Sequence, residues 1–453
     1  MNLKKAKDDN YAAVVVEIKT LVPLENCTNV QGAIIMGQQV IVGNDVKVGD
    51  IGLYFPLESQ LTKEYLVANN LYRNAELNSD TTKKGYFDEN GRIRCQKFVK
   101  HDSEGLFMPI ESIEFTGVKV SDLKLGNEFD ELEGVEICRK YIVKATRIQG
   151  LPGTGKAGRN MNDKMKDKMI ENQFKFHADT SILYKNTHKI QAETIVHLSF
   201  KQHGSSNISS NVLIKKNLKW YERLLAKLGL NIPTTEYGYI YSSGKPKSKL
   251  PKGIVGRYLN ENGDYYADDI WKESFDYLKD FLTQGLSIYS EIVGYTKTGA
   301  MVQSQYDYGC VAPKLGEPYT CGVNYKIAVY RVTYTNPEGK TFEFPPLQVQ
   351  EWCNKMGLTP VFQLYYGYAK DLFITNGREV PDETEFGQKF MELLKELYND
   401  KKCFMCKNNV FEEGVVIRVD GLNFEAYKQK SKLFLEAETK QLDKGIVNIE
   451  DEA

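Results

Sequence analysis

The sequence has no apolar run long enough to cross a membrane, although it contains 453 residues. Its first residues, 1–8, have no apolar core of the kind that a signal peptide requires. Eight cysteines are scattered along the chain, which does not indicate a disulfide scaffold in a protein of this size. These absences predict a cytoplasmic protein, either the cell's own or encoded by a virus, with no membrane partner.

The chain also lacks an excess of charge of either sign. It has 59 Lys and Arg against 60 Asp and Glu, for a net charge of −1. This balance neither supports nor excludes nucleic acid as a partner, because the local distribution of charge matters more than the total. Three basic runs stand out, at 215–219, 245–252 and 428–432.

Internal repeats and low-complexity tracts are absent, and the length is enough for two or three domains. The first third has strand-like segments separated by turns rich in Gly, Asn and Asp, without helical periodicity between them. This spacing predicts a small closed β-barrel over residues 1–135, preferably a five-stranded OB-type barrel, with an SH3-like or other small barrel as the alternative. The segments lie at 12–18, 32–36, 39–42, 50–55, 91–99 and 105–110.

Residues 136–175 are predicted to be a linker. Residues 150–156 match the pattern G-x-x-x-x-G-K, but Ala157 stands where a phosphate-binding loop needs a hydroxyl, so that interpretation is rejected. An α+β domain is predicted over 176–440, followed by an acidic tail at 441–453. Helices are expected at 215–228, 270–282 and 386–397, and strands at 194–200, 286–293, 325–334 and 414–419.

The turn after the predicted strand 194–200 reads Lys201-Gln202-His203-Gly204. A strand fixes the position of the lysine, and a glycine lets a phosphate approach the backbone. A lysine in this position can act as a nucleophile if its pKa is lowered. Taken alone, a surface lysine in a polar turn is the simpler interpretation.

Further along the chain, five residues follow in a set order: Glu291 near the end of an apolar strand, Tyr330 within another, Glu413 before a third, and Lys428 and Lys430 on one face of a fourth. Each has an ordinary structural explanation, such as a solvated carboxylate, a packed aromatic ring or a basic strand edge. Their order after Lys201 is the specific feature.

That order resembles the covalent nucleotidyltransferase superfamily of polynucleotide ligases and RNA capping enzymes, over 175–435. Within it, the chain looks most like RNA ligases of the RNA ligase 5 family, because the barrel-like segment comes first and only a short tail follows Lys430. The resemblance implies an OB-like nucleic-acid-binding barrel followed by a nucleotidyltransferase (ATP-grasp-like ligase) domain of antiparallel sheets flanked by helices.

The resemblance also implies roles for these residues. Lys201 would attack the α-phosphate of ATP and become lysyl-AMP. Gly204 would allow close approach of the nucleotide, and Tyr330 would stack on the adenine. Glu291 would hold a ribose hydroxyl or a metal-bound water.

The remaining roles concern phosphate and metal. Glu413 would orient the hydration shell of Mg²⁺ or Mn²⁺. His203, where most ligases have an acidic residue, would contact a phosphate, a metal-bound water or the lysine. Lys428 and Lys430 would neutralise the α-phosphate and the charge that develops during displacement.

The implied activity is ATP-dependent ligation of RNA ends or nicks that carry a 3′-OH and a 5′-phosphate, by a monomer. Its partner would be a nicked RNA duplex, RNA ends or an RNA/DNA hybrid. A DNA ligase, a capping-type guanylyltransferase and an inactive nucleic-acid-binding relative are the alternatives. Cys403-Phe404-Met405-Cys406 is a lone C-x-x-C, for which free thiols are expected over zinc or a redox centre.

Overall fold

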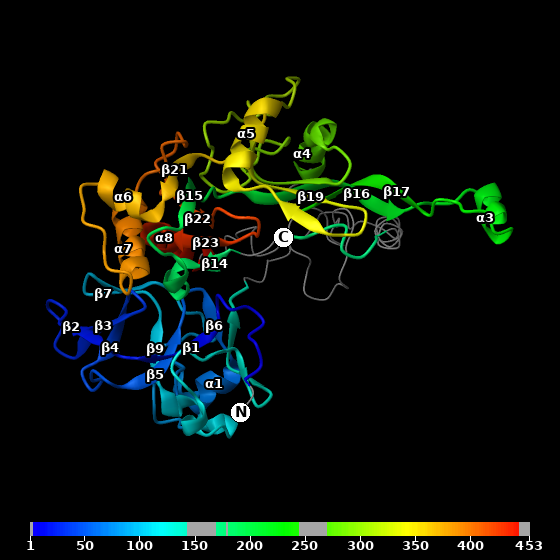
Figure 1. The fold of residues 1–453 in the computed structure, drawn as a ribbon. Coiled ribbons are helices and arrows are strands. Elements are labelled where there is room, and N and C mark those ends of the chain that lie inside the picture. Colours follow the sequence, from blue (N-terminus) through cyan, green and yellow to red (C-terminus); the bar gives the residue numbers. More distant parts are fainter. Residues whose placement is uncertain (1–2, 143–168, 178–179, 244–269, 444–453) are drawn as a thin grey trace.

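The computed structural model describes residues 3–142, 169–177, 180–243 and 270–443. The first of these ranges is built from short antiparallel strands, drawn in blue and cyan in Figure 1. One sheet has the order β10-β1-β5-β9 and a second has the order β2-β3-β4. The strands are β1 (Ala13–Glu17), β2 (Thr20–Val22), β3 (Val30–Ile35), β4 (Gln38–Gly43), β5 (Ile51–Phe55), β9 (Leu106–Pro109) and β10 (Glu128–Phe129).

Strand β1 is apolar at consecutive positions because both of its faces are covered. Ala13 and Val15 belong to a core under helix α1 (Lys63–Ala68), whereas Val14 and Val16 belong to a core that also includes Ala33 of β3. The four-stranded sheet therefore lies between two hydrophobic cores.

The described strands of this region do not form one closed barrel. Strand β4 meets the segment before β9 through separate bonds, such as that from the Glu104 amide to the Gln39 carbonyl oxygen at 2.7 Å, and no continuous ladder joins them. Within the expected strand 91–99, only β7 (Gln96–Phe98) forms, paired with β8 (His101–Ser103). The remaining short pairs are β6 (Ser59–Leu61) with β13 (Cys138–Lys140) and β11 (Glu131–Leu132) with β12 (Val135–Glu136).

The rest of the described chain is built around two five-stranded sheets, in the orders β14-β23-β22-β15-β21 and β17-β16-β18-β19-β20. All neighbours are antiparallel except β14 and β23. The strands are β14 (Ser181–Ile182), β15 (Ile195–Phe200), β16 (Ser205–Lys215), β17 (Thr235–Ser242), β18 (Leu286–Gly294), β19 (Tyr325–Thr335), β20 (Thr341–Glu343), β21 (Gln363–Tyr368), β22 (Gly414–Val419) and β23 (Ala426–Lys430).

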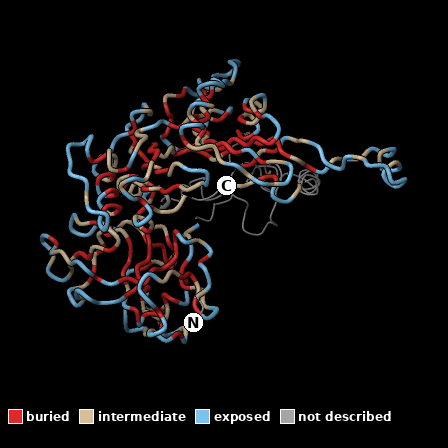
Figure 2. The backbone as a smooth tube through the Cα atoms, viewed as in Figure 1, coloured by how far each residue is buried: buried red, intermediate tan, exposed pale blue. Residues whose placement is uncertain are grey.

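Helices cover the outer face of each sheet. The first sheet shares a core with α6 (Ala369–Thr375) and α7 (Phe386–Tyr398), and the second shares one with α4 (Ile270–Leu278) and α5 (Pro346–Met356). Figure 2 shows buried backbone through the strands of both sheets. The mixed helix and strand content with antiparallel sheets agrees with the α+β prediction.

One expected element differs from the structure, and one helix was not expected. The predicted helix 215–228 is shorter, because β16 runs on to Lys215 and α3 (Trp220–Lys227) begins only after it, at the tip of the β16–β17 extension (Figure 1). The chain after Lys430 begins with a helix, α8 (Lys432–Asp443). None of the helices described in the structure is both long and apolar enough to span a bilayer.

The expected linker and tail fall largely outside the described residues. Strand β13 pairs with β6, so the pairing of the first region reaches Lys140, and Phe174 belongs to the same core as Ile208 of β16. The rejected phosphate-loop match at 150–157 and the end of the acidic tail, from 444 on, lie outside the described residues.

Candidate active site

Lys201 lies where the chain passes from one five-stranded sheet to the other. It follows the last residue of β15, and its amide donates to the Gly414 carbonyl oxygen at 2.9 Å. Strand alternation turns Leu198 toward the core under α6 and α7, whereas Ser199 and Lys201 line a cleft. The register of β15 therefore decides that Lys201 faces the cleft.

Glu413 lies directly behind Lys201. Because Phe200 pairs with Val415 in the antiparallel ladder, Glu413 comes beside the lysine, with Oε1 2.7 Å from Lys201 Nζ. The side chain of Glu413 is fully buried, whereas that of Lys201 is 16% exposed. A buried carboxylate thus holds the ammonium group at the edge of the cleft.

His203 contacts the other oxygen of the same carboxylate. Its Nδ1 lies 3.4 Å from Glu413 Oε2, and its ring packs edge-on against Tyr306 and Phe434 at 4.9 and 5.0 Å between centroids. The His203 amide donates to the hydroxyl oxygen of buried Tyr308 at 2.6 Å. His203 is therefore enclosed behind Glu413 and is not among the residues that line the cleft.

Gly204 is explained by packing between strands. A Cβ atom at this position would lie 2.4 Å from the Ile292 carbonyl oxygen and 2.8 Å from Cγ of Glu291. Real side chains cannot accept such distances, so only glycine lets β16 begin this close to β18. The sequence predicted a glycine that admits phosphate; the contact seen here is with protein, and Gly204 is not among the cleft-lining residues.

Glu291 and Tyr330 line the cleft on the other sheet. Glu291 lies opposite Ser206 in the ladder of β18 with β16. The Tyr330 hydroxyl, on β19, lies 3.2 Å from Ser206 Oγ and 3.3 Å from His177 Nδ1, and the His177 ring meets the Tyr330 ring edge-on. Burial raises the pKa of Tyr330, so the phenol stays neutral.

Lys428 and Lys430 lie at alternate positions of β23, as predicted, and both line the cleft. Lys430 Nζ lies 2.9 Å from Glu58 Oε1 and 3.9 Å from Glu438 Oε2. Burial works against ionisation of Glu58, but Lys430, Lys428 and Lys140 lower its pKa to about 2. Glu58 is therefore a carboxylate at neutral pH.

Three residues of the first region complete the cleft: Tyr11, Glu58 and Lys140. The sequence did not single them out, because nothing in their local pattern links them to a motif more than 60 residues away. The residues expected at the site that do line the cleft are Lys201, Glu291, Tyr330, Lys428 and Lys430.

The charges and rings of the cleft suit a compact polyanion joined to a flat group. Cationic side chains outnumber carboxylates in its lining: Lys140, Lys201, Arg418, Lys428 and Lys430 against Glu58, Glu291 and Glu438. Tyr330 and Phe424 line it as well. His197, also in the lining, has its pKa lowered to about 4 by burial and by Arg418, so it is neutral at physiological pH.

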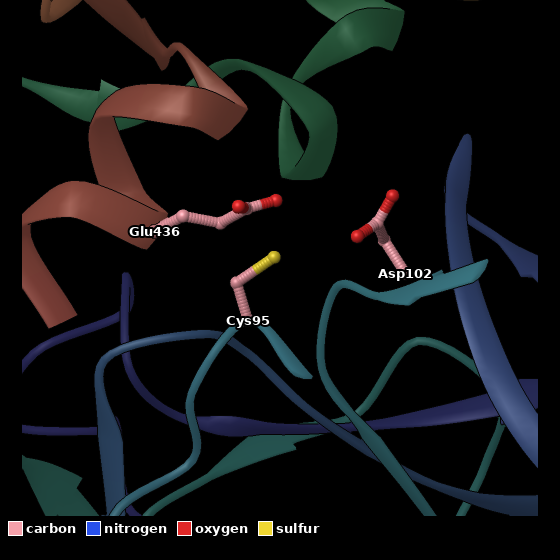
Figure 3. Close-up of side chains that lie close together, drawn as sticks. All are labelled: Cys95, Asp102 and Glu436. Carbon is pink, nitrogen blue, oxygen red and sulfur yellow. The ribbon is translucent and has the colours of Figure 1, made fainter. Parts of the chain in front are cut away.

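A group of three possible metal ligands lies between the first region and α8. Cys95, Asp102 and Glu436 turn their side chains toward one another (Figure 3) and could each offer one ligand atom to a metal. Lys97 Nζ, however, lies 3.7 Å from both carboxylates, and Lys432 forms an ion pair with Asp102. Burial and nearby carboxylates also raise the pKa of Cys95 to about 12. Because lysines already balance its charge, this cluster is best explained as a contact between the two parts of the chain.

The fold is similar to that of solved RNA ligase structures from Naegleria gruberi. A variant solved with ATP and Mn has a TM-score of 0.55 and 13% sequence identity, and the match covers 94% of this chain and 98% of that chain. The structure with PPi and a variant with AMP and Mn each have a TM-score of 0.54, with the same identity and coverage. No family model matches the chain, and no curated protein matches it by sequence. Over nearly its whole length, the chain therefore has the fold of these RNA ligase structures.

Proposed function

We propose that the chain is an ATP-dependent RNA ligase that works through a lysyl-AMP intermediate. The observation that carries the proposal is the placement of Lys201, which faces a cation-lined cleft while a buried carboxylate holds it from behind. The fold shared with Naegleria gruberi RNA ligase, solved with ATP, AMP, Mn and PPi, supports the same conclusion.

In the first step, Lys201 Nζ attacks the α-phosphate of ATP as a neutral amine. The bond from the α-phosphorus to the bridging oxygen breaks, pyrophosphate leaves, and the amine loses its proton as the P–N bond forms. Lys428 and Lys430 offset the negative charge on the phosphates as it shifts to the leaving group. Tyr330 offers a flat surface for adenine, and Glu291 an acceptor for a ribose hydroxyl.

A divalent cation fits the donor chemistry of this site. Apart from its ion-pair contacts with Lys201 and His203, neither oxygen of Glu413 makes a hydrogen bond within the described residues. Carboxylate oxygens suit Mg²⁺ or Mn²⁺, and Glu413 would hold the ion through its waters. Such an ion lowers the pKa of a nearby amine and neutralises phosphate charge. His203, closed in by two aromatic rings, would orient Glu413 rather than bind the ion.

The later steps follow from the same chemistry. AMP passes from Lys201 to the 5′-phosphate of an RNA end, and a 3′-OH then attacks that phosphate and releases AMP. The N-terminal β-rich region, which we propose to be an OB-type module as in the RNA ligase 5 family, would hold the nucleic acid backbone. We propose that the protein acts as a monomer on nicks or RNA ends.

Sealing assays separate this function from its alternatives. Wild-type protein with ATP should join a 5′-labelled nick whose 3′-OH strand is RNA faster than one whose 3′-OH strand is DNA. Equal or faster sealing of the DNA substrate would indicate a DNA ligase. Use of GTP in place of ATP would indicate a capping-type enzyme, and adenylylation with no transfer to any acceptor would indicate a relative that only binds nucleic acid.

A further inference from the structure

Cys403 and Cys406 stand at the two ends of a tight turn whose central residues are Phe404 and Met405. Both cysteines are free thiols; Cys403 is buried and Cys406 is partly exposed. The first and last residues of such a turn have Cα atoms within about 7 Å, close to the spacing that a disulfide spans. The Cys403 amide donates to the Val410 carbonyl oxygen at 2.9 Å and anchors one end of the turn. A disulfide would therefore need little movement of the backbone.

The two thiols have unequal surroundings. The Cys403 thiol donates toward Cys406, which together with the backbone amide of Tyr308 lowers the pKa of Cys406 despite burial. The same contact and burial raise the pKa of Cys403. A partly exposed thiol that ionises more easily, beside a buried partner that ionises less easily, is the arrangement of a dithiol in which one sulfur attacks and the other resolves.

The turn also touches the residues that flank Lys201. The Phe404 ring lies 5.7 Å from that of Phe200, and Gln202 Nε2 donates to Met405 Sδ at 3.8 Å. A change of conformation in this turn would therefore reach the residues on both sides of the nucleophile.

We propose that Cys403 and Cys406 form a reversible dithiol–disulfide site that reacts with low-molecular-weight disulfides and slows adenylylation of Lys201 when oxidised. The effect on Lys201 rests on the proposed ligase function, whereas formation of the disulfide does not. A cytoplasmic disulfide of this kind is usually transient and serves redox sensing.

The small disulfide is the only oxidant that this reaction requires. The Cys406 thiolate attacks one of its sulfurs, the S–S bond breaks, and one thiolate leaves. Cys403 then loses its proton and attacks Cys406 Sγ in the mixed disulfide, which expels the second thiolate. Two protein thiols are oxidised, one small disulfide is reduced to two thiols, and the two protons are carried away on them.

Thiol counting tests the site without any assay of ligation. Full-length reduced protein is incubated with defined ratios of oxidised to reduced glutathione, free thiols are alkylated, and the peptides are analysed by mass spectrometry. We expect two fewer alkylated cysteines and a linked 403–406 peptide. We expect no such link in Cys406→Ser, and an unchanged link in the matched control Cys353→Ser, whose cysteine is buried in α5. Absence of the link at every ratio would overturn the proposal.

The rate of label transfer from ATP to Lys201 tests the coupling. Oxidised wild-type protein should react about tenfold or more slowly than reduced protein, because small misplacements of reacting groups have large effects on rate, and a dithiol reductant should restore the rate. Cys406→Ser should react at the same rate under both conditions. A linked peptide with an unchanged rate would overturn the coupling. Reduced protein that takes no label would refute the ligase function and the coupling with it, and thiol counting would still decide whether the disulfide site exists.

Discussion

The contact between Lys201 and Glu413 places a single buried carboxylate beside the proposed nucleophile. Oε1 of Glu413 lies 2.7 Å from Lys201 Nζ, and the side chain has no exposure to solvent. Replacement by glutamine keeps the shape and removes the charge. We expect Glu413→Gln to lower the rate of lysine adenylylation by roughly 100-fold or more, because preorganised charge at a reacting group contributes this much in other enzymes.

The measurement is a rapid-quench time course of label transfer from ATP, with the melting temperature of each variant as a check on folding. Glu396→Gln is a matched control, since that side chain is 57% exposed on α7 and pairs with Arg378. A Glu413→Gln rate close to that of the control would contradict the role of the carboxylate.

Two substitutions at Tyr330 separate the contribution of its aromatic ring from that of its hydroxyl. Tyr330→Phe keeps the ring and loses the contacts to Ser206 and His177, whereas Tyr330→Ala loses both. Base stacking on an aromatic ring is worth about 1–3 kcal/mol, so we expect Tyr330→Ala to raise the apparent KM for ATP roughly tenfold and Tyr330→Phe to change it by less than about threefold. Equal effects of the two variants would mean that the hydroxyl, and not the ring, binds the nucleotide.

At the scale of elements, the close approach of β16 to β18 depends on Gly204. A Cβ atom there would meet the Ile292 backbone at 2.4 Å, so Gly204→Ala must push the two strands apart. We expect it to lower the free energy of unfolding by about 1–3 kcal/mol, the usual range for overpacked sites. Gly421→Ala is the control, because a Cβ atom at Gly421 would meet nothing within 4 Å. Denaturant unfolding that ranks the two variants equally would contradict this explanation.

The sequence predicted elements best where their composition or period is distinctive. Helix α7 lies close to its expected bounds because its apolar positions repeat with the helical period. Strands β15, β18, β19 and β22 do so because they are rich in branched and aromatic residues. Prediction from the sequence failed for segments whose conformation depends on tertiary contacts. Residues 205–215 are rich in Ser and Asn but form the long strand β16, because ladders with β17 and β18 satisfy their backbone hydrogen bonds. Their sequence does not alternate between apolar and polar residues, so it did not predict a strand.

The same limit applies within the site. The order of Lys201, Glu291, Tyr330, Glu413, Lys428 and Lys430 predicted a common site, and all of these residues except Glu413 line one cleft. The enclosed position of His203 and the packing at Gly204 could not be predicted, because they depend on which strands meet across the two sheets.

At the scale of the whole molecule, the N-terminal region reaches into the cleft. Glu58, at φ 65° in the turn after β5, contacts Lys430 with a carboxylate where a phosphate of bound ATP would need that lysine. We expect Glu58→Gln to lower the Kd for ATP about three- to tenfold, because displacing a carboxylate from a charge-assisted hydrogen bond costs roughly 1 kcal/mol or more. Glu64→Gln, at an exposed position of α1, is the control.

The pH dependence of this effect follows from the lowered pKa of Glu58, about 2 in the folded protein against 4.5 for an ordinary glutamate. Its contacts with the lysines therefore stabilise the fold above about pH 4.5, and this contribution is lost only as the pH falls through about 2. The difference in ATP affinity between wild type and Glu58→Gln should be constant from pH 6 to 8 in equilibrium binding. Weaker binding by Glu58→Gln, or a difference that vanishes in this range, would contradict competition by the carboxylate.

Covalent adenylylation of Lys201 can be detected by labelling the protein with ATP. Wild-type protein, Lys201→Ala and the exposed-lysine control Lys314→Ala are incubated with a divalent cation and ATP labelled at the α-phosphate. We predict acid-labile, alkali-stable label on the wild type and on Lys314→Ala, none on Lys201→Ala, and release of the label by pyrophosphate. No label on the wild type from ATP or GTP, or equal label on Lys201→Ala, would rule out a lysyl-AMP intermediate at Lys201.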